Sequence, residues 1–295
     1  MRDRLLLGPV LIALLVGLFW ADEALDHTTA PAWLHGFFAD QTTFPPGTVL
    51  FLAGVPLLIL AARELSAMFK ANGIDASRRV MSVAAILGLC VTSLIPDGLG
   101  GVRASQTAHT TAAIVLLGAL LFHSRKRTFE GVMASAAGAL LSYVYLGLLF
   151  GFLLAIRREH SAWVVLWVLV VTKSCDIGAF FTGKSIGRRK LIPWLSPGKT
   201  WEGLFGGVIF AAMIGAGGAM ILDAGGIARI SWVAGACAGM LFGMVGQVGD
   251  LLESLLKRDS GIKDASSTLP GFGGVLDVLD SPLLVAPVAY WWLAA

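Results

Sequence analysis

"VMASAAGALLSYVYLGLLFGFLLAI", residues 132–156, contains no charged side chain. A helix needs about 20 consecutive apolar residues to cross the hydrocarbon core of a bilayer, so this stretch is long enough to span a membrane. The rest of the chain has the same character. Of its 295 residues, 56% are hydrophobic and only 14% are charged, whereas a soluble domain carries about 25% charged residues. The sequence therefore predicts an all-α polytopic membrane protein.

Nine hydrophobic segments can be marked, and we expect each to form a transmembrane helix. They cover about residues 5–21, 47–62, 80–95, 107–123, 132–156, 161–182, 203–222, 230–248 and 278–294. The first segment also has the length of a secretory signal peptide. No small-residue cleavage site follows it and Asp22-Glu23 comes at once, so we interpret it as a retained span. No hydrophilic linker divides the chain. We expect one integral membrane domain over 1–295. Residues 1–165 form its N-terminal helices, and residues 166–295 form a C-terminal half that contains long polar tracts between the spans.

The basic residues between these segments predict the orientation of the chain. They gather in alternate loops, at Arg2, Arg4, Arg63, Lys70, Arg78, Arg79, Arg125, Lys126, Arg127, Lys184, Arg188, Arg189, Lys190, Lys199, Lys257, Arg258 and Lys263. The positive-inside rule makes those loops cytoplasmic, with the N-terminus inside and the C-terminus outside. Loop 22–46 contains acids and no Lys or Arg, as expected of an exported loop. Arg157 and Arg158 are exceptions to the rule.

Composition also excludes several classes of partner and site. The formal net charge of +3 is small, and topology explains the basic residues, so no nucleic-acid partner is expected. Cys90, Cys175 and Cys237 are isolated in apolar surroundings, which is not the spacing of a metal or redox site.

The tract "GQVGDLLESLLKRDSGIKD", residues 246–264, holds the first acidic cluster. If it is helical from residue 249, Asp250, Glu253, Ser254 and Lys257 share one face. An amphipathic helix at the membrane interface is one interpretation, and it explains the leucines and the basic residues. It explains Asp250 less well, because Asp250 abuts the glycine-rich span 230–248, where an acid at depth costs about 2.5–3.5 kcal/mol without a partner. A cation is one such partner.

A second cluster lies in "KDASSTLPGFGGVLDVLDS", residues 263–281. Asp277 and Asp280 share a face if the last span begins there. The preceding Pro and Gly residues interrupt a helix, and such a bend can turn backbone N–H groups towards an anion. Helix capping is the alternative, and it explains one of the two aspartates more readily than both. Two carboxylates from different helices commonly hold Mg²⁺, and Asp250 with Asp277 is the predicted pair.

The third tract is "CDIGAFFTGKSIGRRKLIPWLSPGKTWEG", residues 175–203. Asp176 lies in an apolar run, which makes it either paired or functional. Ser196-Pro197 predicts a turn, after which Lys199, Thr200 and Glu202 begin the next span. Lysine and a hydroxyl group beside a helix N-terminus suit a phosphate. A Walker A motif is excluded because position 193 is Pro. Alternatively, Lys199 is an interfacial lysine whose ammonium reaches water.

These tracts together resemble the phosphatidate cytidylyltransferase family over roughly residues 170–285. The family pattern S-x-x-K-R-x-x-x-x-K-D, then L-P-G-H-G-G, then L-D-R-x-D-S, is matched at Ser254, Lys257, Arg258, Lys263, Asp264, Leu269, Pro270, Gly271, Gly273, Gly274, Leu276, Asp277, Asp280 and Ser281. The upstream pattern is matched at Asp176, Gly178, Ala179, Gly183, Ser196, Pro197, Lys199, Thr200, Glu202 and Gly203. Phe272 replaces the family's His, and Val278 replaces its Arg.

The resemblance implies transfer of CMP from CTP to phosphatidic acid, giving CDP-diacylglycerol and pyrophosphate at the cytoplasmic face of the C-terminal half. It implies that Asp250 and Asp277 bind Mg²⁺, with room for a second cation, K⁺ or Mg²⁺. It also implies that phosphate charge is neutralised by Lys199, Lys257, Arg258 and Lys263. The catalytic residues would be Asp250, Asp277, Lys199, Lys257 and Asp280. Further substrate-binding residues would be Asp176, Ser196, Thr200, Glu202, Ser254, Asp264, Gly273, Gly274 and Ser281. A homodimer in the bilayer is implied by the family likeness alone.

Three other functions fit parts of the pattern. A polyprenol kinase or a CDP-ether-lipid synthase would also use CTP at a membrane, and analysis of the lipid product separates them from phosphatidate cytidylyl transfer. A cation-coupled transporter also places acids and broken helices in the membrane. It predicts internal repeats and acids at mid-membrane, whereas this chain shows no convincing repeat and its acids collect towards one face.

Overall fold

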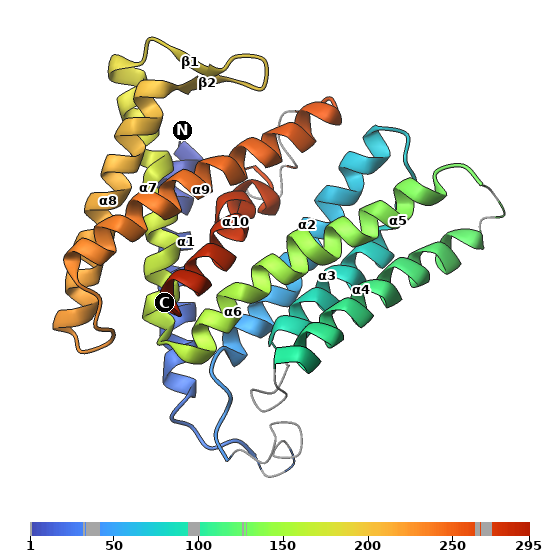
Figure 1. Cartoon of the computed structure of the whole chain (residues 1–295), viewed down its shortest axis with the longest axis horizontal. Coiled ribbons are helices and arrows are strands. Elements are labelled where there is room, and N and C mark those ends of the chain that lie inside the picture. The colour runs from blue at the N-terminus through green and yellow to red at the C-terminus, as the bar shows by residue number, and fades with distance from the viewer. Residues whose placement is uncertain are drawn as a thin grey trace. The chain divides into compact units, whose positions relative to one another are not determined.

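The computed structural model describes residues 2–31, 33, 42–93, 101–125, 127, 129–262, 266 and 273–295. Apart from one β-hairpin, the described chain is helical (Figure 1). The elements are α1 (Arg2–Leu25), α2 (Thr48–Ala71), α3 (Arg78–Ser93), α4 (Gly101–Ser124), α5 (Val132–Leu141), the π-helix η3 (Ser142–Leu148), α6 (Leu149–Glu159), α7 (Ala162–Ile186), β1 (Lys190–Ile192), β2 (Ser196–Thr200), α8 (Trp201–Ala224), α9 (Trp232–Asp259) and α10 (Val275–Leu293). The all-α prediction is confirmed.

Seven helical stretches in the described residues are long and apolar enough to cross a membrane, so the chain is a multi-pass membrane protein. They are Gly8–Leu25, Thr48–Ala71, Arg103–Ser124, Val132–Glu159, Ala162–Ile186, Trp201–Ala224 and Trp232–Asp259. Helices also form at the predicted segments 80–95 and 278–294, as α3 (Arg78–Ser93) and α10 (Val275–Leu293); residues 94–95 lie outside the described residues. However, α3 has only 16 residues and the 19-residue α10 carries two aspartates. The prediction of nine spans is therefore not confirmed.

The chain divides into two compact units. Unit one comprises Met1–Gly54, Leu153–Gln247 and Val288–Ala295, and unit two comprises Val55–Phe152 and Val248–Pro287.

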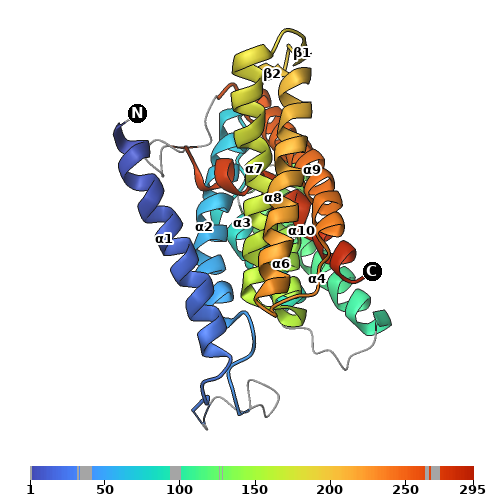
Figure 2. The same ribbon diagram turned by 90° about the vertical axis from the view of Figure 1, so that its left-hand side faces the viewer.

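In unit one, α7 and α8 run side by side with the β1–β2 hairpin at their shared end, as Figures 1 and 2 both show. Small residues allow this close packing. A Cβ placed on Gly207 would lie 2.6 Å from the backbone oxygen of Cys175, and small residues are typical of helix interfaces in membranes. The hairpin was not predicted. Its strands are too short to show a period-two pattern, and Ser196 begins β2 opposite Ile192 rather than forming a turn.

A buried ion cluster in unit one surrounds Arg157, one of the two exceptions to the positive-inside rule. The Arg157 side chain is 2% exposed and lies 2.5 Å from Asp22 and 2.5 Å from Asp26, with Glu23 at 3.5 Å. Asp22 also accepts hydrogen bonds from the backbone N–H groups of Val49 (2.8 Å) and Leu50 (3.0 Å) at the start of α2. The charge of Arg157 is therefore neutralised by the acids that end α1, and it carries no orientation signal of its own.

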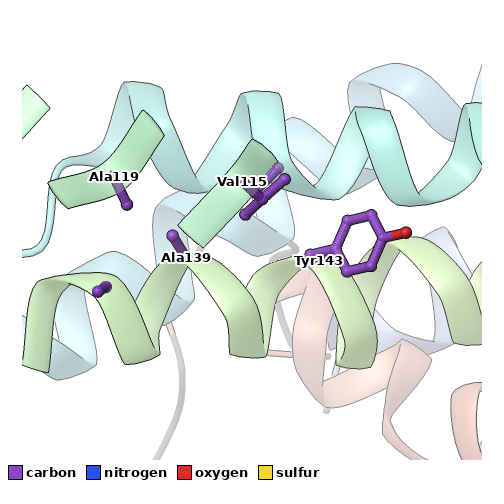
Figure 3. Close-up of a cluster of buried hydrophobic side chains, with 6 residues drawn as sticks. Val115, Ala119, Ala139 and Tyr143 are labelled. Atoms are coloured by element: carbon purple, nitrogen blue, oxygen red, sulfur yellow. The ribbon is translucent and has the colours of Figure 1, made fainter. Parts of the chain in front are cut away.

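In unit two, α3, α4, α5 and η3 pack through small side chains. Val115 and Ala119 of α4 face Ala139 of α5 and Tyr143 of η3 in a buried cluster (Figure 3). A Cβ on Gly88 of α3 would lie 2.5 Å from the backbone oxygen of Tyr143. Because only glycine permits this approach, α3 can lie directly against the π-helix.

Candidate active site

Three carboxylates from two helices converge in unit two. Asp250 and Glu253 lie on α9 and Asp280 lies on α10, and one oxygen from each lies within 4.8 Å of the others. A glycine brings the helices together, since a Cβ on Gly249 would lie 2.7 Å from the backbone oxygen of Asp280. The helix α9 is continuous to Asp259. Asp250 and Glu253 therefore belong to the last turns of one long helix, and no separate interfacial helix begins at residue 249.

Lys257 joins these acids to Asp277. Its ammonium group forms an ion pair with Glu253 Oε2 and donates a hydrogen bond of 2.7 Å to Asp277 Oδ1. Glu253 is fully buried, and its Oε1 atom accepts no hydrogen bond from any described residue. Two of the four carboxylates, Glu253 and Asp277, thus contact Lys257. Buried charge of one sign is costly unless it is paired, so the cluster favours a bound cation.

The first turn of α10 orients the two aspartates of the C-terminal motif. Asp277 Oδ2 accepts a hydrogen bond of 2.6 Å from the backbone N–H of Gly274, so this residue caps the helix as well as contacting Lys257. Gly273 has φ of +94°, a conformation that favours glycine. Asp280 is 4% exposed, and its Oδ1 atom accepts from the backbone N–H of the fully buried Ser281 at 2.5 Å. The Gly-Gly bend and the acids thus form one local structure.

Tyr145 of η3 is a residue that the sequence did not indicate. Its side chain is buried, and its hydroxyl group has no hydrogen-bond partner among the described residues. Buried hydroxyl groups are normally paired. A π-helix often marks a functional site, but the apolar run 132–156 gives no signal of one.

Unit one holds a separate chain of polar side chains around Lys199. The Lys199 ammonium donates a hydrogen bond of 2.9 Å to Gln247 Oε1, and Gln247 Nε2 donates one of 2.6 Å to Asp176 Oδ1. Lys173 lies 3.6 Å from Asp176. The interpretation of Asp176 as a paired acid therefore fits. Gln247 was not predicted, although a polar residue within the glycine-rich run 230–248 was an available signal.

Thr200 of β2 and Glu202 of α8 form hydrogen bonds that stabilise the local structure around the hairpin. Thr200 caps α8, since its Oγ1 atom accepts from the backbone N–H of Gly203 at 3.1 Å. Glu202 Oε2 accepts from the backbone N–H groups of Arg188 (3.0 Å) and Arg189 (3.2 Å). These bonds hold the segment before β1 against the start of α8. Ser196 is half-buried in β2.

The other predicted site residues differ in their surroundings. Ser254 is half-buried and Arg258 is exposed on α9, and Val278, where the family has Arg, is 39% exposed on α10. Lys263, Asp264 and Phe272 lie outside the described residues. The group of three close carboxylate oxygens contains Asp250 but not Asp277, and the predicted Asp250–Asp277 metal pair stays a prediction.

Comparison with known proteins places the chain in a family. The model described as "Cytidylyltransferase family" matches residues 29–295. A phosphatidate cytidylyltransferase of Bacillus subtilis is 38% identical over 156 residues, which is 52% of this chain and 56% of the relative. One from Pseudomonas aeruginosa is 46% identical over 133 residues, 44% and 48% of the two chains. One from Synechocystis is 30% identical over 278 residues, 82% and 88% of the two chains.

These matches differ in extent. They span about half the length of the Bacillus and Pseudomonas relatives, and most of the Synechocystis relative. Because the family model covers nearly the whole sequence, and with it both polar clusters, the chain belongs to the cytidylyltransferase family.

Proposed function

We propose that this protein transfers CMP from CTP to phosphatidic acid, giving CDP-diacylglycerol and pyrophosphate. The observation that carries the proposal is the cluster of Asp250, Glu253 and Asp280 beside Lys257 in a chain of the cytidylyltransferase family. Several relatives bear the name phosphatidate cytidylyltransferase. Three close carboxylates beside a lysine suit a reaction in which phosphate groups bind together with a divalent cation.

The side chains of the cluster fit Mg²⁺. Its preferred ligands are oxygens, and it takes one or two carboxylates together with waters and substrate phosphates. Asp250, Glu253 and Asp280 would hold the ion, with Asp277 near it through Lys257, and the unpartnered Oε1 atom of Glu253 supports this assignment. When bound, Mg²⁺ would neutralise charge on the α-phosphate and on the departing pyrophosphate. A second cation, K⁺ or Mg²⁺, remains part of the proposal.

Catalysis of this reaction depends more on positioning the two substrates and neutralising their phosphate charges than on proton transfer. A phosphate oxygen of phosphatidic acid forms a bond to the α-phosphorus of CTP, and the bond between the α-phosphorus and the bridging oxygen to the β-phosphate breaks. The lipid phosphate is already a nucleophile, so no general base is needed. Lys257, held by Glu253 and Asp277, would place its ammonium beside the reacting phosphates.

Tyr145 in unit two and Lys199 in unit one are each proposed to contact phosphate. The buried, unpartnered Tyr145 hydroxyl would donate a hydrogen bond to a substrate oxygen. Lys199, whose ammonium is oriented by Gln247, would neutralise a phosphate. Further substrate contacts are proposed for Ser196, Thr200, Glu202, Asp176, Ser254, Arg258, Lys263, Asp264, Gly273, Gly274 and Ser281.

We also propose nine membrane spans, with the N-terminus and the active site in the cytoplasm and the C-terminus outside. The alternating basic loops support this orientation. The pairing of Arg157 with the acids of loop 22–46 supports it too, because it accounts for one of the two exceptions. Cysteines introduced one at a time into the loops, tested with a membrane-impermeant thiol reagent, would check it. The expected homodimer is checked by measuring the mass of the purified protein in detergent.

Labelled CTP distinguishes the proposed activity from that of a lipid kinase. Purified protein is incubated with phosphatidic acid, Mg²⁺ and CTP labelled at either the α- or the γ-phosphate. CMP transfer puts the α-label in the lipid and releases the γ-label as pyrophosphate. A kinase would instead put the γ-label in the lipid acceptor. Lipid that gains no α-label would refute the proposal.

A further inference from the structure

Glu64 is a buried acid that none of the polar motifs includes. It lies on α2, where its side chain is 3% exposed. The predicted second span ended at residue 62, but α2 continues to Ala71, so Glu64 is an acid within a membrane helix. Such a residue is costly unless its carboxylate is satisfied, and it commonly serves a function.

The Glu64 carboxylate caps α10 from another helix. Its Oε1 atom accepts hydrogen bonds from the backbone N–H of Val275 (3.0 Å) and from the Ser266 hydroxyl (2.6 Å). Its Oε2 atom accepts from the backbone N–H of Leu276 at 2.8 Å. Helices leave their first N–H groups without internal partners, and a carboxylate at this end also interacts favourably with the helix dipole.

The Gly-Gly bend leaves space for this cap. The residue before α10 is Gly274, which has no side chain to cap the helix, and a Cβ there would lie 2.5 Å from Glu64 Oε2. The backbone N–H of Gly274 donates its hydrogen bond to Asp277 and not to Glu64. The N–H groups of residues 274, 275 and 276 are thus all bound by carboxylates, two of them by Glu64.

The capped turn carries the acids of the proposed metal site. Asp277 and Asp280 lie in the first two turns of α10, and Asp280 is the only member of the three-carboxylate cluster that α9 does not supply. We propose that Glu64 is a positioning residue, whose carboxylate holds the start of α10 so that Asp280 meets Asp250 and Glu253. This inference rests on the metal site of the proposed function. Residues that orient metal ligands typically contribute 10–100-fold to metal affinity.

The test measures metal binding directly, without turnover. Mn²⁺ serves as the probe for the oxygen-ligand site, and its dissociation constant for the purified protein in detergent is obtained from the EPR signal of free Mn²⁺. Glu64→Gln keeps the size of the side chain but turns an amide N–H₂ group towards a backbone donor. We expect it to weaken Mn²⁺ binding about 10–100-fold. Glu64→Asp keeps the negative charge, but its shorter side chain places the carboxylate farther from the start of α10. It should therefore weaken Mn²⁺ binding less than Glu64→Gln does. It is the variant to use if Glu64→Gln does not accumulate.

The matched control is Asp22→Asn in unit one. Asp22 is also a buried carboxylate that accepts from two N–H groups at the start of a helix, those of Val49 and Leu50. Its loss should lower thermal stability without changing the Mn²⁺ dissociation constant. Wild-type affinity in both Glu64 variants, or equal weakening by Asp22→Asn, would overturn the inference. If the wild-type protein binds Mn²⁺ and Glu64→Gln weakens that binding, but no CMP is transferred, the Glu64 inference stands and the proposed function fails.

Discussion

Replacing Tyr145 by Phe should make the protein at least as stable and much less active. The change removes one hydroxyl group and keeps the ring. Among the described residues that buried hydroxyl has no hydrogen-bond partner, and an unsatisfied buried polar group costs about 1–3 kcal/mol. Removing the hydroxyl group should therefore raise the free energy of unfolding by part of that amount. If the hydroxyl binds a substrate oxygen, kcat/KM should fall about 10-fold, since one neutral hydrogen bond is worth about 1 kcal/mol and more at a charged acceptor.

Tyr143→Phe is the matched control, two residues away in the same π-helix. The Tyr143 hydroxyl donates a hydrogen bond of 2.9 Å to the backbone oxygen of Ala108. Its removal should cost about 0.5–1.5 kcal/mol of stability and leave CMP transfer unchanged. Thermal unfolding in detergent and initial rates with labelled CTP measure the two effects. If Tyr145→Phe lost stability and kept full activity, the hydroxyl would be structural and the reasoning would be refuted.

Four further substitutions test other parts of the account. Asp277→Asn should nearly abolish CMP transfer while the protein still inserts, because it removes a charge that holds Lys257; unchanged turnover would take Asp277 out of the site. Lys199→Ala should lower kcat/KM more than Lys190→Ala, an exposed lysine of the same hairpin, and equal rates would argue against its phosphate role. Arg157→Leu should cost about 3–5 kcal/mol of stability, since it leaves buried acids unpaired, and a KM for CTP that changed with it would contradict a purely structural role. Phe272→His should be tolerated in the activity assay, and complete loss would show that the aromatic ring has a packing role.

The sequence predicted the helices well because membrane spans need long apolar runs, which are visible in one dimension. It failed where a helix continues into polar residues. α2 extends past Arg63 and Glu64, and α9 runs through Asp250 to Asp259. Glu64 accepts hydrogen bonds from the start of α10, and Lys257 forms ion pairs with Glu253 and Asp277, so polar side chains of both helices have partners inside the protein. The hairpin escaped prediction because three- and five-residue strands are too short to show a pattern.

The candidate site was predicted in part for a similar reason. Asp250, Lys257, Asp277 and Asp280 stood out as charges in or beside apolar segments, and they do gather in unit two. Which of them share an ion depends on how α9 and α10 pack at Gly249, and periodicity along one helix does not contain that information. Glu64 and Gln247 form hydrogen bonds with residues distant in sequence, which the sequence alone does not show. Tyr145 stands out only because its buried hydroxyl group has no hydrogen-bond partner among the described residues.

Locating a bound Mn²⁺ ion by anomalous diffraction from crystals of this protein tests the central claim most directly. The account predicts a strong peak with carboxylate oxygens of Asp250, Glu253 and Asp280 in its coordination sphere. Direct coordination by Asp277 in place of Asp280 would favour the pair predicted from the sequence. A peak that touches none of these acids, or no peak at saturating Mn²⁺, would contradict the account.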